Sequence, residues 1–201
     1  MIAFEGVEGA GKSTQLHLTA ESLRERGHCV VETREPGGTA LGAQMRRLLM
    51  HEYDHPPAPF AELFLYLADR AQHIAEVIGP SLAAGQVVLT DRFSASTIAY
   101  QGYARGLDLA TVVLLDERAR QGVSPDLTLI LDCPAEAGLQ RAHGDDRFHR
   151  ERLAFHERVR HGFLTMAKAR PDLYRVVDAT APSAIVRAQI LEAVLECLNT
   201  E

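Results

Sequence analysis

The sequence contains no apolar run close to the roughly 20 residues that a membrane-spanning helix needs, and no charged and apolar leader precedes its first predicted strand. We therefore expect no contact with membranes and a cytoplasmic location. The chain also lacks an excess of positive charge. Its formal net charge is −6 at pH 7, whereas surfaces that bind nucleic acid carry clustered Lys and Arg, so we expect no nucleic-acid partner.

Cysteine is scarce as well. Cys29, Cys133 and Cys197 are odd in number, widely separated and without metal-ligand spacing. This pattern predicts buried or half-buried thiols in a reducing compartment and indicates neither a disulfide nor a zinc site. No internal repeat or linker interrupts the chain, and its 201 residues suit one α/β domain over residues 1–201.

Short apolar runs rich in β-branched residues alternate with amphipathic segments along the chain. The predicted strands are residues 2–4, 29–33, 87–90, 127–131 and 175–177. The predicted helices are residues 13–26, 41–50, 58–84, 109–120, 134–142, 150–169 and 182–199, with a proline-rich turn before the third. This alternation predicts a mostly parallel five-stranded sheet with helices on both faces.

The first predicted strand is followed by a segment that fits the phosphate-binding loop pattern of two glycines, a lysine and a hydroxyl residue. The segment is Gly6, Val7, Glu8, Gly9, Ala10, Gly11, Lys12, Ser13 and Thr14, and it opens a predicted helix. Glycines let successive N–H groups face one concavity, and the helix N-terminus adds partial positive charge. We expect ATP there, with Lys12 on the β and γ phosphates and the Ser13 hydroxyl on Mg²⁺. A glycine-rich turn without a ligand is the alternative.

Charged residues also follow the second and third predicted strands, at the edge where ligands bind in open α/β sheets. Arg34 begins a turn-rich segment that, taken alone, is better explained as a plain loop. Asp91 and Arg92 stand together after the third strand. A carboxylate there can hold Mg²⁺, and Arg92 can clamp a phosphate through two hydrogen bonds. An ion pair that caps the loop is the alternative.

Two further segments carry residues suited to a nucleotide. Tyr66 and Arg70 are four residues apart on one predicted helix, where an aromatic ring and a guanidinium can bind a base. From the residues alone, a core tyrosine and a surface arginine explain this pair better. Residues 141–150 are polar and broken by glycine, and they suit either a mobile lid or a solvated loop. The histidines form no metal-ligating pattern, and we expect them to be surface residues.

Taken together, these segments resemble the bacterial thymidylate kinase family over most of the chain. Four stretches carry the resemblance: residues 6–14, the Arg-Glu-Pro-Gly-Gly-Thr signature at 34–39, Asp91-Arg92-Phe93 continued by 99–102, and Asp146-Arg147 followed by 155–160. The signature separates this family from adenylate, guanylate and cytidylate kinases. The resemblance implies a P-loop kinase fold, transfer of the ATP γ-phosphate to dTMP to give dTDP and ADP with Mg²⁺, and a homodimer.

The resemblance also implies roles for individual residues. Glu8 matches an acidic loop residue that faces the 3′-hydroxyl of the acceptor, and Arg92 matches an arginine on the dTMP phosphate. Tyr66 stands where the family usually stacks a phenylalanine on thymine, and Arg70 matches the arginine that contacts the base. The remaining acceptor residues are Arg34, Ser96, Thr97, Tyr100 and Gln101.

The lid departs from the family pattern. Some members place a basic residue inside the phosphate loop, but Gly9 occupies that position, which resembles the type that supplies an arginine from the lid. Arg147 is our first candidate for this catalytic role and Arg141 the second. Phe148 and His149 replace the usual aliphatic residue and glutamate, and His149 suggests a pH-sensitive lid.

Two other functions use the same phosphate loop. A kinase that prefers dUMP or dGMP would differ only around Tyr66, Arg70 and Thr97. A nucleotide-dependent switch would leave the acceptor residues without a purpose, and the chain has no guanine-reading Asn-Lys-x-Asp segment.

Overall fold

A computed structural model describes residues 1–142 and 147–199. Its centre is a five-stranded, entirely parallel sheet in the order β2-β3-β1-β4-β5. The strands are β1 (Ile2–Glu5), β2 (Val30–Arg34), β3 (Val87–Asp91), β4 (Leu127–Asp132) and β5 (Tyr174–Asp178). This confirms the predicted sheet. The central strand β1 is buried along its whole length, as expected for a strand covered on both faces.

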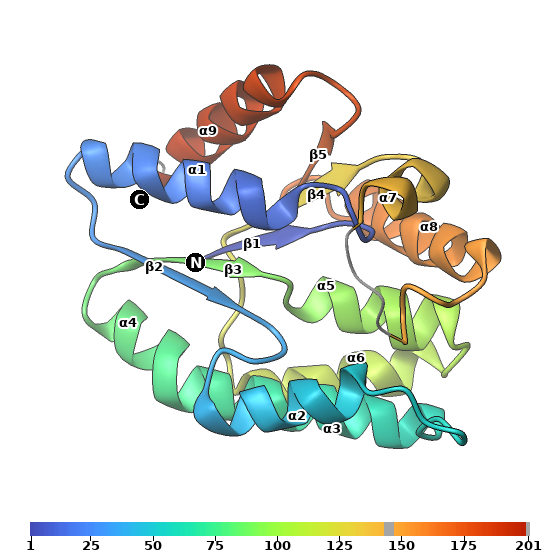
Figure 1. The fold of residues 1–201 in the computed structure, drawn as a ribbon. Coiled ribbons are helices and arrows are strands. Elements are labelled where there is room, and N and C mark those ends of the chain that lie inside the picture. Colours follow the sequence, from blue (N-terminus) through green and yellow to red (C-terminus); the bar gives the residue numbers. More distant parts are fainter. Residues whose placement is uncertain (143–146, 200–201) are drawn as a thin grey trace.

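Helices cover both faces of the sheet (Figure 1). Helices α1 (Lys12–Glu25) and α9 (Ser183–Asn199) pack together on one face, and α2 (Ala40–Met50), α3 (Pro59–His73), α4 (Gly79–Ala83) and α6 (Leu109–Arg120) lie on the other. The shorter α5 (Ser94–Thr97) and α7 (Ala135–Arg141) follow strands, and α8 (Leu153–Ala169) packs on β4 and β5. Local signals set several helix starts: Thr39 caps α2 by accepting from Gly42 N, and Pro59 begins α3.

Two helical segments differ from the sequence prediction. The long helix predicted over 58–84 is continuous, but its middle is a π-helical segment, η1 (Ile74–Ile78). Residues 94–104, for which no helix was predicted, form α5 and a second π-helical segment, η2 (Ile98–Ala104). The left-handed backbone of Arg92, with a φ of 71°, turns the chain away from β3 just before α5.

Some predictions about single residues were wrong. His73 and His156 are buried rather than at the surface, because each lies on the inward face of its helix. Cys29 is exposed, since it lies in the turn before β2, whereas Cys133 is buried and Cys197 half-buried, and all three are free thiols. Within 1–142 and 147–199, no helix is long and apolar enough to cross a membrane.

The sheet register places the predicted functional segments at one edge. Phe4 of β1 and Arg34 of β2 both pair with Asp91 of β3, so the three strands end side by side. The phosphate-loop sequence, the 34–39 signature and the Asp91-Arg92 pair therefore all emerge from the carboxyl edge of the sheet.

Candidate active site

The phosphate-binding sequence forms the connection between β1 and α1. Gly11, with a φ of 90°, immediately precedes the first residue of the helix, Lys12. The Lys12 ammonium is nearly buried and donates to Gly6 O at 3.2 Å and Val7 O at 2.8 Å, so it lies folded over the loop. Burial, and next the charge of Arg92, lower the pKa of Lys12 to about 8.

Gly9 is held where a side chain has no room. Its φ is 70°, and a Cβ built there would lie 1.9 Å from the carbonyl oxygen of Gly138 in α7. A basic side chain at this loop position would therefore force α7 to move. This crowding supports the interpretation that any additional arginine for the phosphates comes from elsewhere in the chain.

The two predicted metal ligands lie against each other. Ser13 begins α1 and Asp91 ends β3, and the Ser13 hydroxyl donates to Asp91 Oδ2. A hydroxyl and a carboxylate are oxygen ligands of the kind that Mg²⁺ prefers, and this ion usually keeps several waters and takes phosphate oxygens for the rest. The donor set therefore fits Mg²⁺ bound with a nucleotide. Over the described ranges, no group of three His, Cys, Asp or Glu forms a closed metal site.

Arg92 is aimed across the mouth of the phosphate loop. Its Nη1 donates to Gly6 O at 3.3 Å and to Ser96 Oγ at 3.1 Å, and its Cζ lies 5.1 Å from the centre of the Tyr100 ring. The Thr90 hydroxyl donates to the Arg92 carbonyl and holds the reversed backbone in place. The alternative of a loop-capping Asp91–Arg92 ion pair receives no support, because the side chains have other partners.

Glu5, for which no role was predicted, holds the segment that follows β3. The side chain is fully buried, and its Oε1 accepts from the backbone N–H groups of Phe93 at 2.8 Å and Ser96 at 3.1 Å. Its Oε2 accepts from the Ser96 hydroxyl at 2.6 Å. Burial raises the pKa of Glu5 to about 7. Its place as the only acidic residue in the first apolar run was the signal in the sequence.

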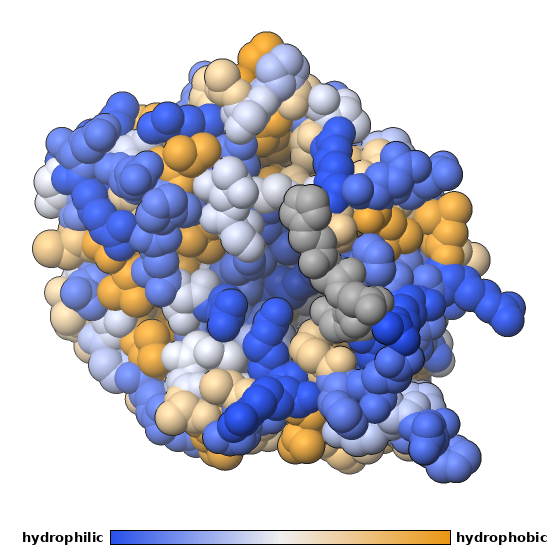
Figure 2. Space-filling view, in the orientation of Figure 1, coloured by the Kyte–Doolittle hydropathy of each residue, from blue (hydrophilic) through white to orange (hydrophobic). Residues whose placement is uncertain are grey.

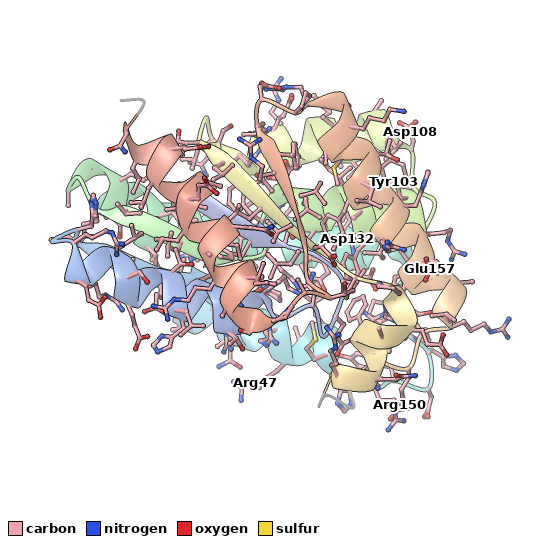
Figure 3. All side chains as sticks on the ribbon, turned by 90° about the horizontal axis from the view of Figure 1, so that it is seen from above. Arg47, Tyr103, Asp108, Asp132, Arg150 and Glu157 are labelled. Atoms are coloured by element: carbon pink, nitrogen blue, oxygen red, sulfur yellow. The ribbon has the colours of Figure 1, made fainter. Side chains whose placement is uncertain are left out.

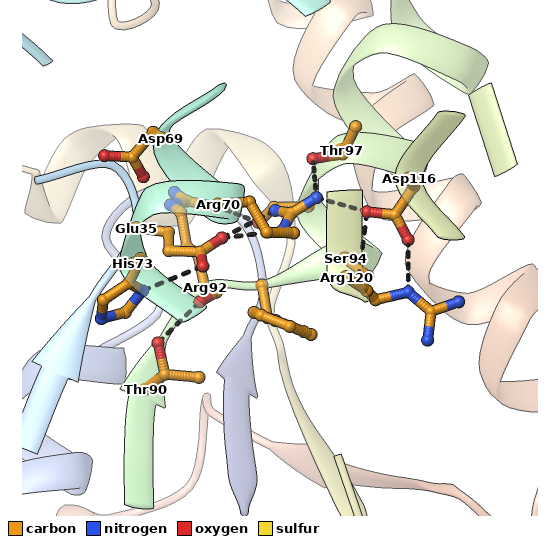
Figure 4. Close-up of polar contacts among 12 residues, drawn as sticks. Glu35, Asp69, Arg70, His73, Thr90, Arg92, Ser94, Thr97, Asp116 and Arg120 are labelled. Carbon is orange, nitrogen blue, oxygen red and sulfur yellow. Dashed lines mark hydrogen bonds and ion pairs between the residues drawn. The ribbon is translucent and has the colours of Figure 1, made fainter. Parts of the chain in front are cut away.

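Arg70 is 1% exposed, which excludes the surface arginine considered above. Its Nε donates to Glu35 at 2.9 Å, and its Nη1 donates to Thr97 Oγ1 at 2.9 Å and to Asp116 (Figure 4). Nη2 lies 2.8 Å from Glu35. Two buried carboxylates therefore neutralise one buried guanidinium.

This network reaches further on both sides. Glu35 also lies 3.0 Å from Nδ1 of His73, whose Nε2 lies 2.6 Å from the Thr33 hydroxyl. Asp116 accepts from Ser94 and Arg120 as well. The network joins β2, α3, α5 and α6 around the side chain of Arg70 (Figure 4).

A cavity of about 620 Å³ collects most of the predicted site residues. The space-filling view shows a hollow with hydrophilic residues around it (Figure 2). The predicted residues in its lining are Glu8, Gly9, Lys12, Ser13, Arg34, Tyr66, Arg70, Asp91, Arg92, Ser96, Thr97, Tyr100 and Gln101. Gly6, Val7, Ala10, Gly11 and Thr14 belong to the loop and first helical turn but do not line it. Arg46, Glu35 and Phe148 line it without having been predicted.

The lid candidates lie outside this cavity, and residues 143–146 of the predicted lid are outside the described residues. Arg147 Nη2 donates to Glu62 at 2.7 Å and its Nε to Leu49 O at 3.2 Å, while Arg141 donates to Ala179 O at 3.1 Å. Arg150 lies at the surface (Figure 3) and is ion-paired with Glu52. Reaching a phosphate in the cavity would require Arg147 to leave Glu62.

The two residues that depart from the family pattern both face the site. Phe148 lies edge-on to Tyr100, with ring centres 6.0 Å apart, and 6.4 Å from the ring of Tyr66. His149 Nδ1 lies 3.5 Å from Glu8 Oε1. The segment after residue 146 therefore closes one side of the cavity with an aromatic ring and approaches the phosphate loop.

The P-loop nucleoside monophosphate kinases are defined by a phosphate loop that follows the central strand and by a second binding region beside it, at the same edge of the sheet. The family model described as thymidylate kinase matches residues 4–190. Thymidylate kinase of Desulfosudis oleivorans is 47% identical, covering 96% of this chain and 94% of its own, and that of Synechococcus sp. (strain JA-2-3B'a(2-13)) is 51% identical, covering 96% and 93%. The crystal structure of thymidylate kinase from Ehrlichia chaffeensis superposes with a TM-score of 0.79 at 35% identity, covering 96% and 97%. The chain belongs to the thymidylate kinase family.

The lowered pKa of Lys12 predicts how ATP affinity depends on pH. The ammonium is charged below about pH 8 and loses its proton above it, so the affinity of the free protein for ATP falls as pH rises through that value. Calorimetric titration with MgATP at several pH values measures this. Lys12→Arg, whose side chain stays charged, should show a flatter profile whatever its absolute affinity. A wild-type affinity that is constant across this range would contradict the shift.

Proposed function

We propose that this chain transfers the γ-phosphate of ATP to dTMP, giving dTDP and ADP, with the two nucleotides meeting end to end in the cavity described above. The observation that carries this proposal is the position of Arg92, between the phosphate loop and the pocket around Tyr66 and Arg70. Phosphoryl transfer through a metaphosphate-like transition state depends mainly on positioning and on neutralising charge. A cavity with cationic residues between two nucleotide half-sites supplies both.

The donor half binds the ATP phosphates through the loop and Lys12. Ser13 and Asp91 would hold Mg²⁺, which supplies charge neutralisation across the β and γ phosphates when bound. Lys12 exchanges the carbonyls of Gly6 and Val7 for phosphate oxygens, and its depressed pKa rises once an anion lies beside it.

The acceptor half suits a thymine base. Tyr66 offers an aromatic plane for stacking. Arg70 donates three of its five N–H groups, one each to Glu35, Thr97 and Asp116, and its Nη2 lies 2.8 Å from Glu35, so an N–H of Nη2 is available to donate to O4 of thymine. Gln101 donates its amide N–H to Glu62 at 2.9 Å, which turns its carbonyl oxygen toward other donors such as N3–H of the base.

The sugar and phosphate of the acceptor then lie toward the loop. Glu8 can accept from the 3′-hydroxyl, and Tyr100 beside Arg92 disfavours a 2′-hydroxyl. Arg92, Arg34 and Arg46 line the cavity and supply positive charge for the dTMP phosphate. Arg46 also donates to Pro36 O at 3.1 Å, which ties its side chain to the 34–39 segment.

A panel of monophosphates tests this function. With ATP and Mg²⁺ in a coupled ADP-release assay, we expect turnover in the order dTMP, then dUMP, then dCMP. Without the thymine methyl, kcat/KM for dUMP should be about 10-fold or more below that for dTMP. The cytosine amino group would place a second donor against the Arg70 donor, so dCMP should be poorer still. A higher turnover of dUMP or dGMP than of dTMP would mean that dTMP is not the preferred substrate. ATP binding with no turnover of any monophosphate would indicate a switch protein instead.

We propose Arg147 as the arginine that the lid delivers to the phosphates. We expect Arg147→Ala to lower kcat about 10³-fold with little change in KM for ATP, because the side chain would act only in the closed, reacting complex. Steady-state kinetics measures both constants. Arg170→Ala, which removes an exposed arginine paired with Asp172, is the matched control and should be near wild type. Near-normal turnover of Arg147→Ala would exclude this role and favour Arg141.

We also propose that the chain forms a homodimer through α2, α3 and α6. These helices pack side by side on one face of the sheet, and each carries exposed large apolar side chains. The exposed residues are Leu41, Leu48, Phe60, Phe64, Leu109 and Leu114. Exposed large apolar side chains on neighbouring helices are typical of a surface that another copy covers.

Sedimentation velocity tests the dimer. Phe64 is 54% exposed, and placing a charge there in Phe64→Glu would bury two like charges near a two-fold axis, so we expect a monomer. Ile185→Glu changes a similarly exposed apolar residue on α9 and should leave the dimer intact. A monomeric wild type, or a Phe64→Glu variant that remains dimeric, would contradict this interface.

A further inference from the structure

Glu5 is an acidic residue beside the reaction site that does not line the cavity. It ends β1 one residue before the phosphate loop, yet it is 0% exposed and faces the segment that follows β3. Its three hydrogen bonds all go to that segment: two from the backbone N–H groups of Phe93 and Ser96, and one from the Ser96 hydroxyl. The proposed mechanism gives this carboxylate no contact with either nucleotide.

The Ser96 hydroxyl connects Glu5 to Arg92. Its hydrogen is donated to Glu5 Oε2 at 2.6 Å, and its oxygen accepts from Arg92 Nη1 at 3.1 Å. Above its pKa of about 7, the Glu5 carboxylate has no hydrogen to give, so it fixes the direction of this hydroxyl and leaves the lone pairs of Ser96 for the guanidinium. The order of donation is therefore from Arg92 to Ser96 to Glu5.

The negative charge of Glu5 and its lack of a donor group matter at this position, in addition to its shape. A neutral amide of the same shape would still accept from the two backbone N–H groups, because its carbonyl oxygen replaces Oε1. Its NH₂ group would instead donate to Ser96 and push the hydroxyl hydrogen toward Arg92. It would also remove the negative charge that stands behind the Arg92 guanidinium. A buried carboxylate is costly, and here three donors and Arg92 offset part of that cost.

We propose that Glu5 is a positioning residue for the acceptor phosphate: acting through Ser96, it holds the Arg92 guanidinium at the point where the two nucleotides meet. The inference rests on the proposed function only in assigning Arg92 to the dTMP phosphate. Lys12 donates to the loop carbonyls of Gly6 and Val7 rather than to Ser96 or Glu5, so the effect of Glu5 falls mainly on dTMP, and only its charge reaches Lys12.

The test is Glu5→Gln, with dTMP and ATP varied separately in steady-state kinetics. We expect kcat/KM for dTMP to fall about 10- to 100-fold, the range for a weakened hydrogen bond to a charged group, while KM for ATP stays within about twofold. Ser96→Ala should give a similar split, and Glu5→Gln combined with Ser96→Ala should be no worse than the more impaired single variant. Independent, multiplying losses would overturn the connection through Ser96.

A control variant separates the positioning role of Glu5 from a role in the stability of the fold. Thr19→Val removes a buried hydroxyl that donates to Gln15 O at 2.7 Å in α1, and it should lower the melting temperature without the dTMP-specific loss. Unchanged dTMP kinetics in Glu5→Gln, or an equal rise in KM for both nucleotides, would overturn the inference. If Glu5→Gln fails to fold, Ser96→Ala decides by the same criterion. A wild type that does not use dTMP would refute the proposed function instead.

Discussion

The parallel register of β1, β2 and β3 is the constraint on which the rest of the site depends. It brings Phe4, Arg34 and Asp91 level at one edge, so that residues far apart in sequence leave the sheet on adjacent strands. Ser13 reaches Asp91 only because α1 begins directly after the loop that follows β1. A shift of one residue in β1 or β3 would turn its side chains to the opposite face and separate the two predicted metal ligands.

Charge burial beside this edge is extensive, and every buried charge requires an arrangement that compensates it. Arg70 is balanced by Glu35 and Asp116, and removal of one partner from such a group typically costs about 3–5 kcal/mol. These contacts fix the guanidinium before any ligand arrives, so Arg70 would lose little side-chain entropy in binding the proposed base. The same logic applies to Glu5, whose donors come from the backbone that carries Arg92.

Local patterns in the sequence predicted the strands, the phosphate loop and the residues that follow each strand, because these features depend on neighbours a few positions away. The partners Glu5, Asp116 and Arg46 were missed because each acts on residues from a different element, and no local spacing encodes such a pair. Residues 94–104 escaped prediction for a similar reason: the helix follows a left-handed residue, Arg92, whose backbone N–H donates to Phe4 O of another strand. The burial of His73 likewise follows from Glu35, 38 residues away in the chain.

Glu62 links the base pocket to the lid. This buried carboxylate accepts from Gln101, from Arg105 and from Arg147, and so ties a residue proposed to contact the base to the proposed catalytic arginine. Departure of Arg147 would not leave Glu62 unpaired, because Arg105 contacts both of its oxygens. The desolvation cost that normally accompanies breaking a buried ion pair is therefore reduced at this site. An arginine held by a carboxylate that already has a second cation can move toward phosphates at a smaller free-energy cost than one held by a carboxylate of its own.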